Sequence, residues 1–537
     1  MFISKIANVN KQLQIINIKR FLSQSQLREA MIKETTSTEW LKAKPYHTIP
    51  GPSKLKLLKE FLPGGNLFNK PINDITTQLR KVYGDIFIFP GTFGKNDVLY
   101  TFNPKDFRTV FHTEGHYPIR RGFDIIHYHR KIHRPEVFKH AVGLVAEQGK
   151  DWAHFRSAVN PVMMNPKTTK LYASKMSKVS DEFVRRIRNI RDLSTNEVPT
   201  NFEIEINNWA MESVCLVALD KELGMINNSE ANPKARELIN RMQKFFELLF
   251  ELDIKPSLWK YVHTPKFRQA MKIMDEMIDL TTYYIEEAII ELQEQQKTIS
   301  NKGNVKSEHE KSILERLINI DRTVAIVMAL DMLQAGVDTT TSALAGCLLC
   351  LSKNAEKQGK LRLEMKQILP ERHSTITGEK LKHLPYLRAC IKEALRLYPV
   401  ATSNFRSTGQ NVILSGYQVP QDTDIVMPGQ LITQDEKYYD RPKDYLPERW
   451  LRSERGKTDG SGCPLNVNEP FVFLPFGFGP RVCIGKRIVD LELEVILAKL
   501  VRNFYISFDY DVENVFKTHV INVPNKPLQF KFVDTEN

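Results

Sequence analysis

The residue with the clearest chemical potential is Cys483, in the stretch FGFGPRVCIGKR that spans Phe476–Arg487. Glycines stand four positions before it and two positions after it, at Gly479 and Gly485. Glycine lets a backbone approach a flat ligand closely and adopt positive φ. A helix is expected to begin just after Cys483, and its positive end favours a thiolate, as does the nearby Arg481. These neighbours favour a ligating cysteine over an inert buried thiol.

A second chemical signal lies in the longest helical pattern, Arg322–Asn354. The pattern is apolar nearly all round, which predicts a buried central helix of about 50 Å. Its middle nevertheless contains Gly336, Asp338 and Thr339. Burying a carboxylate is costly unless something uses it. A glycine kink whose backbone is satisfied by threonine is the structural alternative, but a kink does not require the acid.

Three further short motifs carry charged pairs. In EALR, Glu393 and Arg396 lie one turn apart and therefore on one helix face. In WAHFR, Trp152 and Arg156 have similar spacing, and PERW contains Arg449. For Arg156 alone, a surface salt bridge is the competing interpretation.

Taken in order, these motifs resemble those of the cytochrome P450 superfamily, over about residues 45–537. The resemblance implies a mostly α fold with a small β subdomain. Haem b would lie between the central helix on one side and the cysteine loop and final helix on the other. It makes Cys483 the axial thiolate, which favours O–O cleavage. The other haem contacts that it implies are Trp152, Arg156, Gly336, Arg406, Phe476, Gly479, Arg481 and Gly485.

The resemblance also implies roles in a monooxygenase reaction. Thr339 would hydrogen-bond the bound oxygen, Asp338 would relay protons, and Gly336 would leave room for O₂ beside the helix. Glu393, Arg396 and Arg449 would form a triad that locks the core behind the haem. An O₂-independent isomerase of the same fold and a non-catalytic haem sensor are the alternatives, but neither needs a buried proton relay.

The amino-terminal segment predicts a mitochondrial protein. Residues 1–28 contain no Asp or Glu and five basic residues: Lys5, Lys11, Lys19, Arg20 and Arg28. The segment has no continuous apolar run, so we expect a transit peptide; a solvated basic tail is the alternative. Residues 29–53 would form a linker with a Pro-rich hinge, and residues 54–537 a single catalytic domain. Six scattered cysteines favour a reducing compartment.

The chain looks most like insect mitochondrial members of the superfamily, which receive electrons from a 2Fe–2S ferredoxin. The resemblance implies a basic docking face, built here from Arg388, Lys392, Lys486 and Arg487. A solvated basic face is the plain alternative. The formal net charge of +13 also suits an anionic membrane, whereas no specific nucleic-acid motif is found.

The expected substrate is a lipophilic small molecule, with a xenobiotic or terpenoid preferred over an ecdysteroid or other steroid. Family comparison indicates contacts from Ile119–Pro135, Phe245–Val262, Met328–Thr339 and Val400–Asn404. The stretches FFELLFEL and SLWKYV suit peripheral contact with the matrix side of the inner membrane, although a buried amphipathic helix pair is also open.

Two other clusters of potential metal ligands are expected not to bind a metal. His127, His129 and His133 have loosely metal-like spacing, but no nearby acid or cysteine is expected to complete a site, and a partly exposed substrate-access loop is the preferred interpretation. Cys347 and Cys350 form a CxxC pair inside the apolar helix and are expected in the core. A charged interval, Gln293–Ser312, is expected to be an exposed connection.

Overall fold

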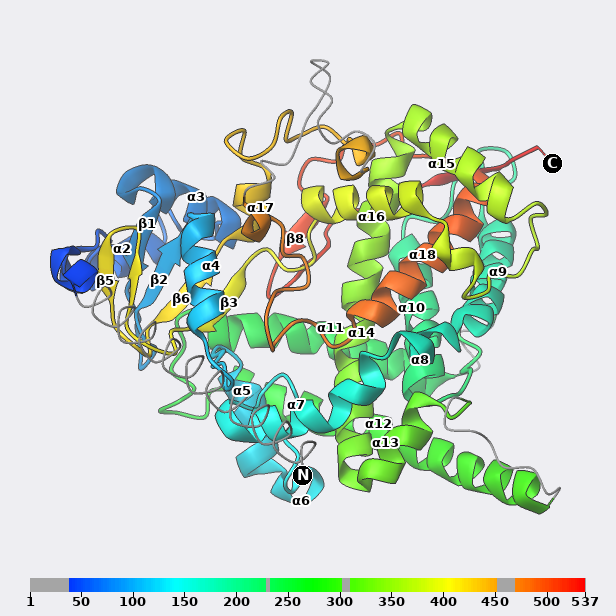
Figure 1. The fold of residues 1–537 in the computed structure, drawn as a ribbon, viewed down its shortest axis with the longest axis horizontal. Coiled ribbons are helices and arrows are strands. Elements are labelled where there is room, and N and C mark those ends of the chain that lie inside the picture. The colour runs from blue at the N-terminus through cyan, green and yellow to red at the C-terminus, as the bar shows by residue number, and fades with distance from the viewer. Residues whose placement is uncertain (1–37, 228–231, 302–309, 452–468, 537) are drawn as a thin grey trace, which may run out of the picture.

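The computed structural model describes residues 38–227, 232–301, 310–451 and 469–536. The predicted transit peptide and the first part of the linker lie outside these residues. A small sheet region lies beside a much larger helical region (Figure 1). The expected mostly α fold with a small β subdomain is therefore confirmed.

The helices make up most of the regular structure and follow one another along the chain from η1 to α18. They are η1 (Tyr46–Thr48), α2 (Lys54–Phe61), α3 (Ile72–Tyr83), α4 (Pro104–Thr113), α5 (Asp124–Tyr128), η2 (His129–His133), α6 (Pro135–Phe138), α7 (Gly149–Met163), α8 (Pro166–Lys170), α9 (Ala173–Ile190), α10 (Phe202–Ala218), α11 (Pro233–Leu249), η3 (Phe250–Ile254), α12 (Pro265–Asn301), α13 (Ile313–Ile320), α14 (Arg322–Ser352), α15 (Ala355–Ile368), η4 (Lys380–Lys382), α16 (Pro385–Leu397), α17 (Gly429–Thr433), η5 (Pro447–Trp450), η7 (Pro470–Val472) and α18 (Lys486–Asn503).

The largest sheet has the strand order β1-β2-β6-β3. Its strands and the three two-stranded pairs, β4–β5, β8–β9 and β10–β7, have these bounds: β1 (Ile86–Phe89), β2 (Val98–Thr101), β3 (Asn404–Ser407), β4 (Val412–Leu414), β5 (Tyr417–Val419), β6 (Asp424–Met427), β7 (Phe504–Ser507), β8 (Phe516–Thr518), β9 (Asn522–Pro524) and β10 (Lys531–Asp534). β1 and β2 form an antiparallel hairpin, and β2 pairs in parallel with β6 so that Val98 lies opposite Asp424.

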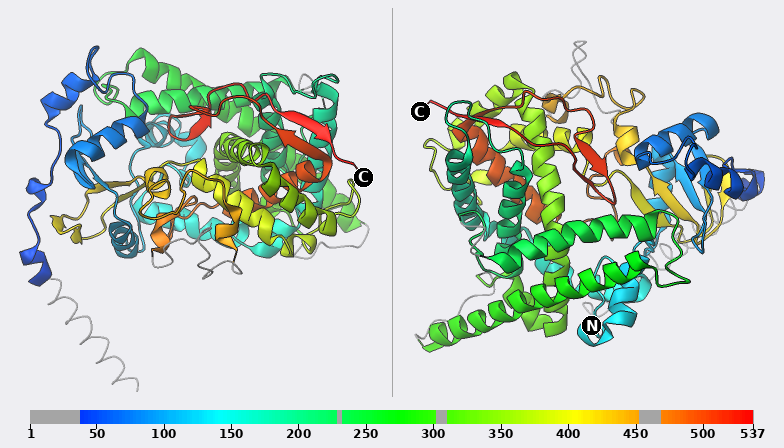
Figure 2. Two further views of the ribbon diagram at one scale, coloured as in Figure 1. Left: turned by 90° about the horizontal axis from the view of Figure 1, so that it is seen from above. Right: turned by 180° about the vertical axis from the view of Figure 1, so that it is seen from behind.

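The helix α14 is the centre of the larger hydrophobic core, as the apolar pattern predicted. It packs along α10, and Figure 2 shows α11 and α12 side by side across the same part of the molecule. In the described part of the chain, α14 is the one helix long and apolar enough to cross a membrane. Because 83% of its most apolar window is buried inside the protein, it is better explained as a core helix.

The predicted connection at Gln293–Ser312 is shorter than expected. Residues 293–301 continue α12, and Ser312 is the N-cap of α13, where its side chain and Glu315 form a capping box. Residues 302–309 lie outside the described part. Gln293 and Glu294 are exposed on α12, so a helix carries this polar stretch at least as far as residue 301, which a loop-like composition does not reveal.

Candidate functional site

The cysteine loop owes its shape to two glycines in the left-handed region. Gly477 and Gly479 have φ of 73° and 76°. The backbone N–H of Cys483 donates to the Phe476 carbonyl at 2.9 Å, which closes the loop. Gly485 has φ −81° and is the N-cap of α18, so a positive φ explains Gly479 but not Gly485.

The electrostatics of Cys483 differ in one respect from the sequence-based expectation. The thiol is exposed at one side but lies in a crowded site, and this burial raises its pKa above 9.0. The Gly485 N–H, Arg156 and Arg120 lower the pKa, but they do not offset the burial. The helix terminus alone therefore does not generate a thiolate, whereas a coordinating metal ion deprotonates a thiol outright.

Three arginines beside this loop carry buried N–H groups without a partner. On these three arginines, the buried atoms without a hydrogen-bond partner among the described residues are Arg120 Nε, Arg156 Nε and Arg481 Nη1. Arg156 donates to the Val482 carbonyl at 2.9 Å, and Arg481 lies 4.2 Å above the Trp152 ring. An unpaired buried donor is costly, so these groups are suited to an anion.

Mutual repulsion reinforces the need for an anion at the arginine cluster. Burial lowers the pKa of Arg120 and of Arg156 to about 10, and that of Arg481 to about 8, where Arg120 and Arg406 add repulsion. Guanidinium groups keep their proton in proteins, so the lowered pKa reflects unbalanced positive charge. Two carboxylates of one cofactor fit this cluster in charge and in hydrogen bonding. Arg120 was not among the sequence-based site residues.

Arg406 is held differently from the other three arginines. It forms an ion pair with the buried Glu114 at 2.6 Å and donates to the Phe405 and Phe478 carbonyls. It therefore lies at the cluster with its own counter-ion. Glu114 was missed by sequence reasoning, since nothing marks an acid at the end of α4 as a buried one.

The acid–alcohol pair lies in the middle of α14. Burial raises the pKa of Asp338 to about 7, with a smaller contribution from Glu203. The Thr339 hydroxyl donates to the Ala335 carbonyl at 2.7 Å, on a side of α14 where Ala335 is exposed. The two side chains leave α14 in different directions: the Asp338 carboxyl is buried, and the Thr339 hydroxyl is partly exposed.

Gly336 has a different role from the one expected. A Cβ at this position would lie 2.8 Å from Val214 Cγ2 of α10. The missing side chain makes room for Val214 of the neighbouring helix, and the expected role of Gly336 beside bound O₂ stays a prediction. A second buried acid lies nearby: burial raises the pKa of Glu492 to about 8, and Thr340 donates to it at 3.3 Å. Glu492 was not predicted, because a Glu in an amphipathic helix usually faces solvent.

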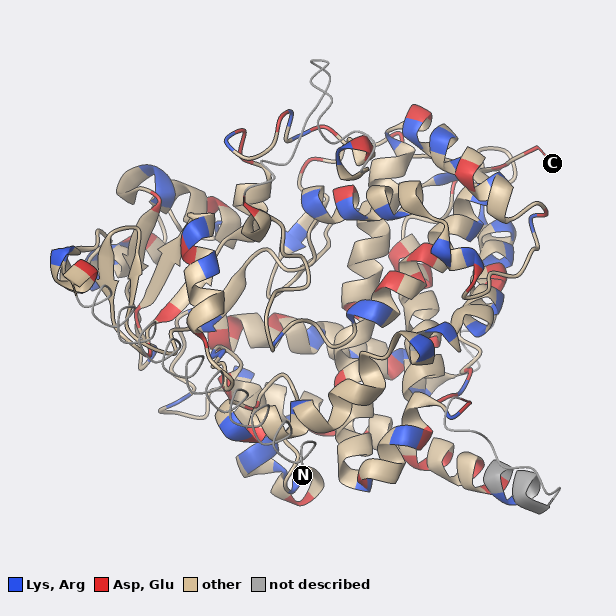
Figure 3. Ribbon diagram, in the orientation of Figure 1, with Lys and Arg blue, Asp and Glu red and all other residues tan. Residues whose placement is uncertain are grey.

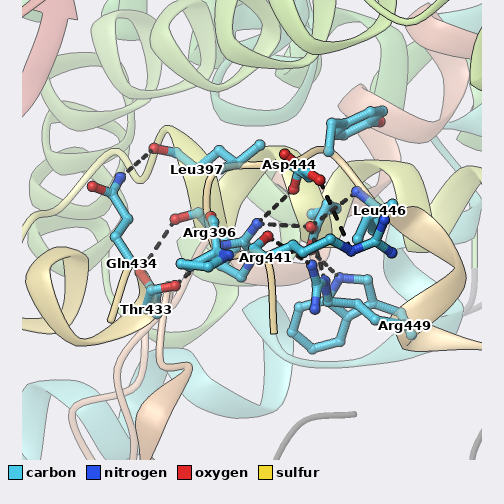
Figure 4. A network of polar contacts seen from close by, with 12 residues as sticks. Arg396, Leu397, Thr433, Gln434, Arg441, Asp444, Leu446 and Arg449 are labelled. Carbon is cyan, nitrogen blue, oxygen red and sulfur yellow. Dashed lines mark hydrogen bonds and ion pairs between the residues drawn. The ribbon is translucent and has the colours of Figure 1, made fainter. Parts of the chain in front are cut away.

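The residues Glu393, Arg396 and Arg449 lie together in the interior. Arg396 Nη2 donates to Glu393 Oε1 at 2.8 Å, and Arg449 Nε donates to the same oxygen at 2.9 Å. Arg396 also donates to the carbonyls of Thr433, Pro442 and Asp444, so all five of its N–H groups are used. Figure 4 shows Arg396 and Arg449 in this one network.

The four residues expected to dock an electron donor lie on α16 and at the start of α18, where Figure 3 shows basic segments. Arg388 forms an ion pair with Glu494 at 2.6 Å, and Lys486 forms one with Asp490 at 2.5 Å. Lys392 and Arg487 are exposed. The face is therefore basic, with part of its charge neutralised locally.

The two clusters expected to lack chemistry have different outcomes. Cys347 and Cys350 are buried in the core, as predicted. The expectation that no acid completes the histidine cluster is wrong, because Asp275 of α12 lies 3.0 Å from both His129 and His133. Sequence spacing misses this contact because Asp275 is 146 positions from His129.

The two stretches considered for membrane contact also differ. In FFELLFEL, the side chains of Phe245, Leu248 and Leu249 are buried, which favours the buried alternative there. In SLWKYV, Tyr261 and Val262 are 68% and 62% exposed. Only the second stretch offers an apolar surface.

Comparison with known proteins identifies the family. Residues 49–532 match the cytochrome P450 family model, and the chain belongs to this family. The expectation of a P450 monooxygenase is thereby confirmed, and membership implies haem iron with a thiolate ligand.

The similar proteins are insect cytochromes P450. Cytochrome P450 CYP12A2 of Musca domestica is 46% identical over 98% of this chain and 99% of its own length. Probable cytochrome P450 12a5, mitochondrial, of Drosophila melanogaster is 46% identical over 93% of both chains. Cytochrome P450 12b1, mitochondrial, of Drosophila acanthoptera is 40% identical over 91% of this chain and 90% of its own. The resemblance to insect mitochondrial members is confirmed.

Proposed function

We propose that the protein is a haem b monooxygenase that inserts one oxygen atom of O₂ into a lipophilic small molecule. The observation that carries the cofactor assignment is the cluster of Arg120, Arg156 and Arg481, whose unpaired buried N–H groups surround the loop of Cys483. When bound, haem supplies the iron at which O₂ is activated. Cys483 would be its thiolate ligand.

The charges of this arrangement balance when the cofactor is included. Four arginines (Arg120, Arg156, Arg406 and Arg481) face one carboxylate, Glu114. A thiolate and two propionates add three negative charges. Since buried charges are stable only when they are compensated, the excess of arginines supports a cofactor that carries carboxylates. Trp152 holds Arg481 in position by stacking.

Proton delivery is assigned to α14. Below about pH 7, the Asp338 carboxyl carries a proton that it can give up. The Thr339 hydroxyl can take part in the next hydrogen bond, on the exposed side of the helix. The hydrogen bond of Thr339 to Ala335 keeps the hydroxyl oxygen oriented, with its lone pairs available. Most of the remaining side chains of α14 are buried, which limits access of water to Asp338.

The proposed setting is the mitochondrion, supported by the names of the relatives. Electrons would come from NADPH through a reductase and a 2Fe–2S ferredoxin, which is acidic and would approach the basic face of α16 and α18. The exposed Leu258, Tyr261 and Val262 support peripheral contact with the matrix side of the inner membrane. Residues 1–28 would be the transit peptide.

The absorbance of the reduced protein under carbon monoxide tests the proposed cofactor ligand. We expect the strongly red-shifted band of thiolate-ligated haem, and its loss in Cys483→Ala. Cys347→Ala, which changes a core cysteine, is the matched control and should keep the band. A spectrum of histidine-ligated haem in the wild type would refute the assignment.

For the substrate, we propose xenobiotics, including insecticides, or terpenoids, with ecdysteroid hydroxylation as the competing assignment. A spin-shift titration compares these classes directly, because a bound substrate displaces the water ligand of the iron. Binding by sterols alone would favour hormone synthesis. Substrate turnover without ferredoxin would favour the isomerase, and absence of ferredoxin-dependent NADPH consumption with every ligand would favour the sensor.

A further inference from the structure

A cluster of metal-ligating side chains lies away from the cysteine loop, where the π-helix η2 meets α12. Asp275 of α12 has one carboxylate oxygen 3.0 Å from His129 Nε2 and the other 3.0 Å from His133 Nε2. The π-helical turn places the two imidazoles side by side, with ring centroids 5.3 Å apart. Two separate elements thus direct three donor atoms at one point.

The separations suit a small tetrahedral ion. One ligand atom from each of His129, His133 and Asp275 lies within 4.8 Å of the other two. With Zn–N bonds of about 2.0–2.1 Å, neighbouring ligands of a tetrahedral zinc lie about 3.3 Å apart. The 3.0 Å separation of His133 Nε2 from Asp275 Oδ2 is close to this value. The three ligand atoms lie within 4.8 Å of one another, so side-chain movement would admit the ion.

The residue types at the cluster also suit a cation. Imidazole nitrogens and carboxylate oxygens are ligands that Zn²⁺ takes in proteins.

The surrounding charges leave room for a dication. Arg134 lies 3.2 Å from Asp275, but it also pairs with Glu136 at 2.7 Å and lies 3.5 Å from Asp279. Arg134 and these three carboxylates have a net charge of −2. The nearby Arg130 is neutralised by Asp331 at 2.6 Å.

We propose that His129, His133 and Asp275 form a binding site for Zn²⁺ that joins η2 to α12. The set provides two imidazole nitrogens and one carboxylate oxygen, and water reaches the fourth position past His133, whose side chain is 37% exposed. Arg134 remains on the carboxylate oxygen that the zinc does not use. The bound ion replaces two hydrogen bonds with coordination bonds between the same elements.

The proposal is tested by measuring the zinc content and zinc coordination of the haem-loaded enzyme. The protein used should carry no added histidines. After dialysis against a zinc buffer, we expect one zinc per chain. X-ray absorption at the zinc edge should show imidazole scattering at about 2.0–2.1 Å. Zinc should also slow amide hydrogen exchange in η2 and in the first half of α12. Wild-type protein that retains no zinc would overturn the proposal.

Substitutions distinguish zinc binding at this site from zinc binding by other surface histidines. His133→Asn and Asp275→Asn should each weaken zinc binding at least ~10-fold. His127→Asn changes a histidine of the same segment outside the cluster and should leave binding unchanged. Asp275→Asn also removes the present hydrogen bonds, so His133→Asn is the cleaner variant. Equal zinc binding by His133→Asn and wild type would contradict the assignment.

Discussion

Gly479 and Glu114 occupy adjoining space that admits no side chain on the glycine. A Cβ at Gly479 would lie 2.3 Å from Glu114 Oε1, and the residue has φ of 76°. Glu114 cannot move away without breaking its ion pair with Arg406. The shape of the cysteine loop and the charge balance of the arginine cluster therefore depend on one another.

Gly479→Ala should lower the free energy of unfolding and weaken haem retention. Positive φ alone costs an alanine about 1–2 kcal/mol, and displacement of Glu114 adds to this. Haem content and urea unfolding measure the effect. Gly359→Ala, within α15 and with nothing within 4 Å of the added Cβ, is the control and should be neutral or stabilising. Equal behaviour of the two variants would contradict the strain argument.

Arg120→Gln should accelerate haem loss at least about tenfold, since a hydrogen bond to a charged group contributes about 1.5–3 kcal/mol. Transfer of haem to an apoprotein acceptor measures the rate. The neighbouring Arg121→Gln is a matched control, because Arg121 pairs with Asp422 and Asp424 instead. If Arg120→Gln retains haem as the wild type does, Arg120 does not hold a propionate.

Arg396→Lys should prevent accumulation of folded, haem-loaded protein. Lysine has three donors and cannot replace the five used by Arg396, so buried oxygens lose partners at a cost of about 3–5 kcal/mol. Arg388→Lys, on the same helix but exposed, should change stability by no more than about 1 kcal/mol. Soluble haem protein per cell measures both, and a normal yield of Arg396→Lys would refute the expectation.

Asp338→Asn should change how stability depends on pH. Because the folded-state pKa is raised to about 7, folded protein binds more protons than unfolded protein between about pH 4 and 7. The wild type therefore loses stability relative to the variant as pH rises through this range, by about 1.4 kcal/mol per pH unit, and the difference levels off above pH 7. Chemical unfolding of both proteins at several pH values measures it; a difference that is constant with pH would show that Asp338 does not titrate in this range.

Arg487→Glu should raise the KM for ferredoxin about tenfold and weaken its dependence on salt, because charges at the rim of an interface act on association. The reduced carbon monoxide spectrum should be unchanged. Arg185→Glu, exposed on α9, is the control. If both reversals act alike, general charge and not a docking face is responsible.

The sequence predicted features that depend on nearby residues. Cys483 and its glycines, and Glu393 with Arg396, are each contained in one short motif, so residue type and spacing suffice. Arg120, Glu114 and Glu492 were missed because their burial depends on elements distant in sequence. For Gly336 the motif was found, but its close approach to Val214 of α10 is a contact that no local pattern identifies.

The parallel pairing of β2 with β6 has a consequence for how the chain folds. Val98 pairs with Asp424, and Arg156 donates to the Val482 carbonyl, although the two residues of each pair are far apart in the sequence. Contacts between such distant positions carry a large loop-closure cost and form slowly. The largest sheet cannot be completed without β6, and Arg156 has no Val482 carbonyl to bind until the cysteine loop is in place. The sheet and the cofactor cradle are therefore expected to close late in folding, after the local helices have formed.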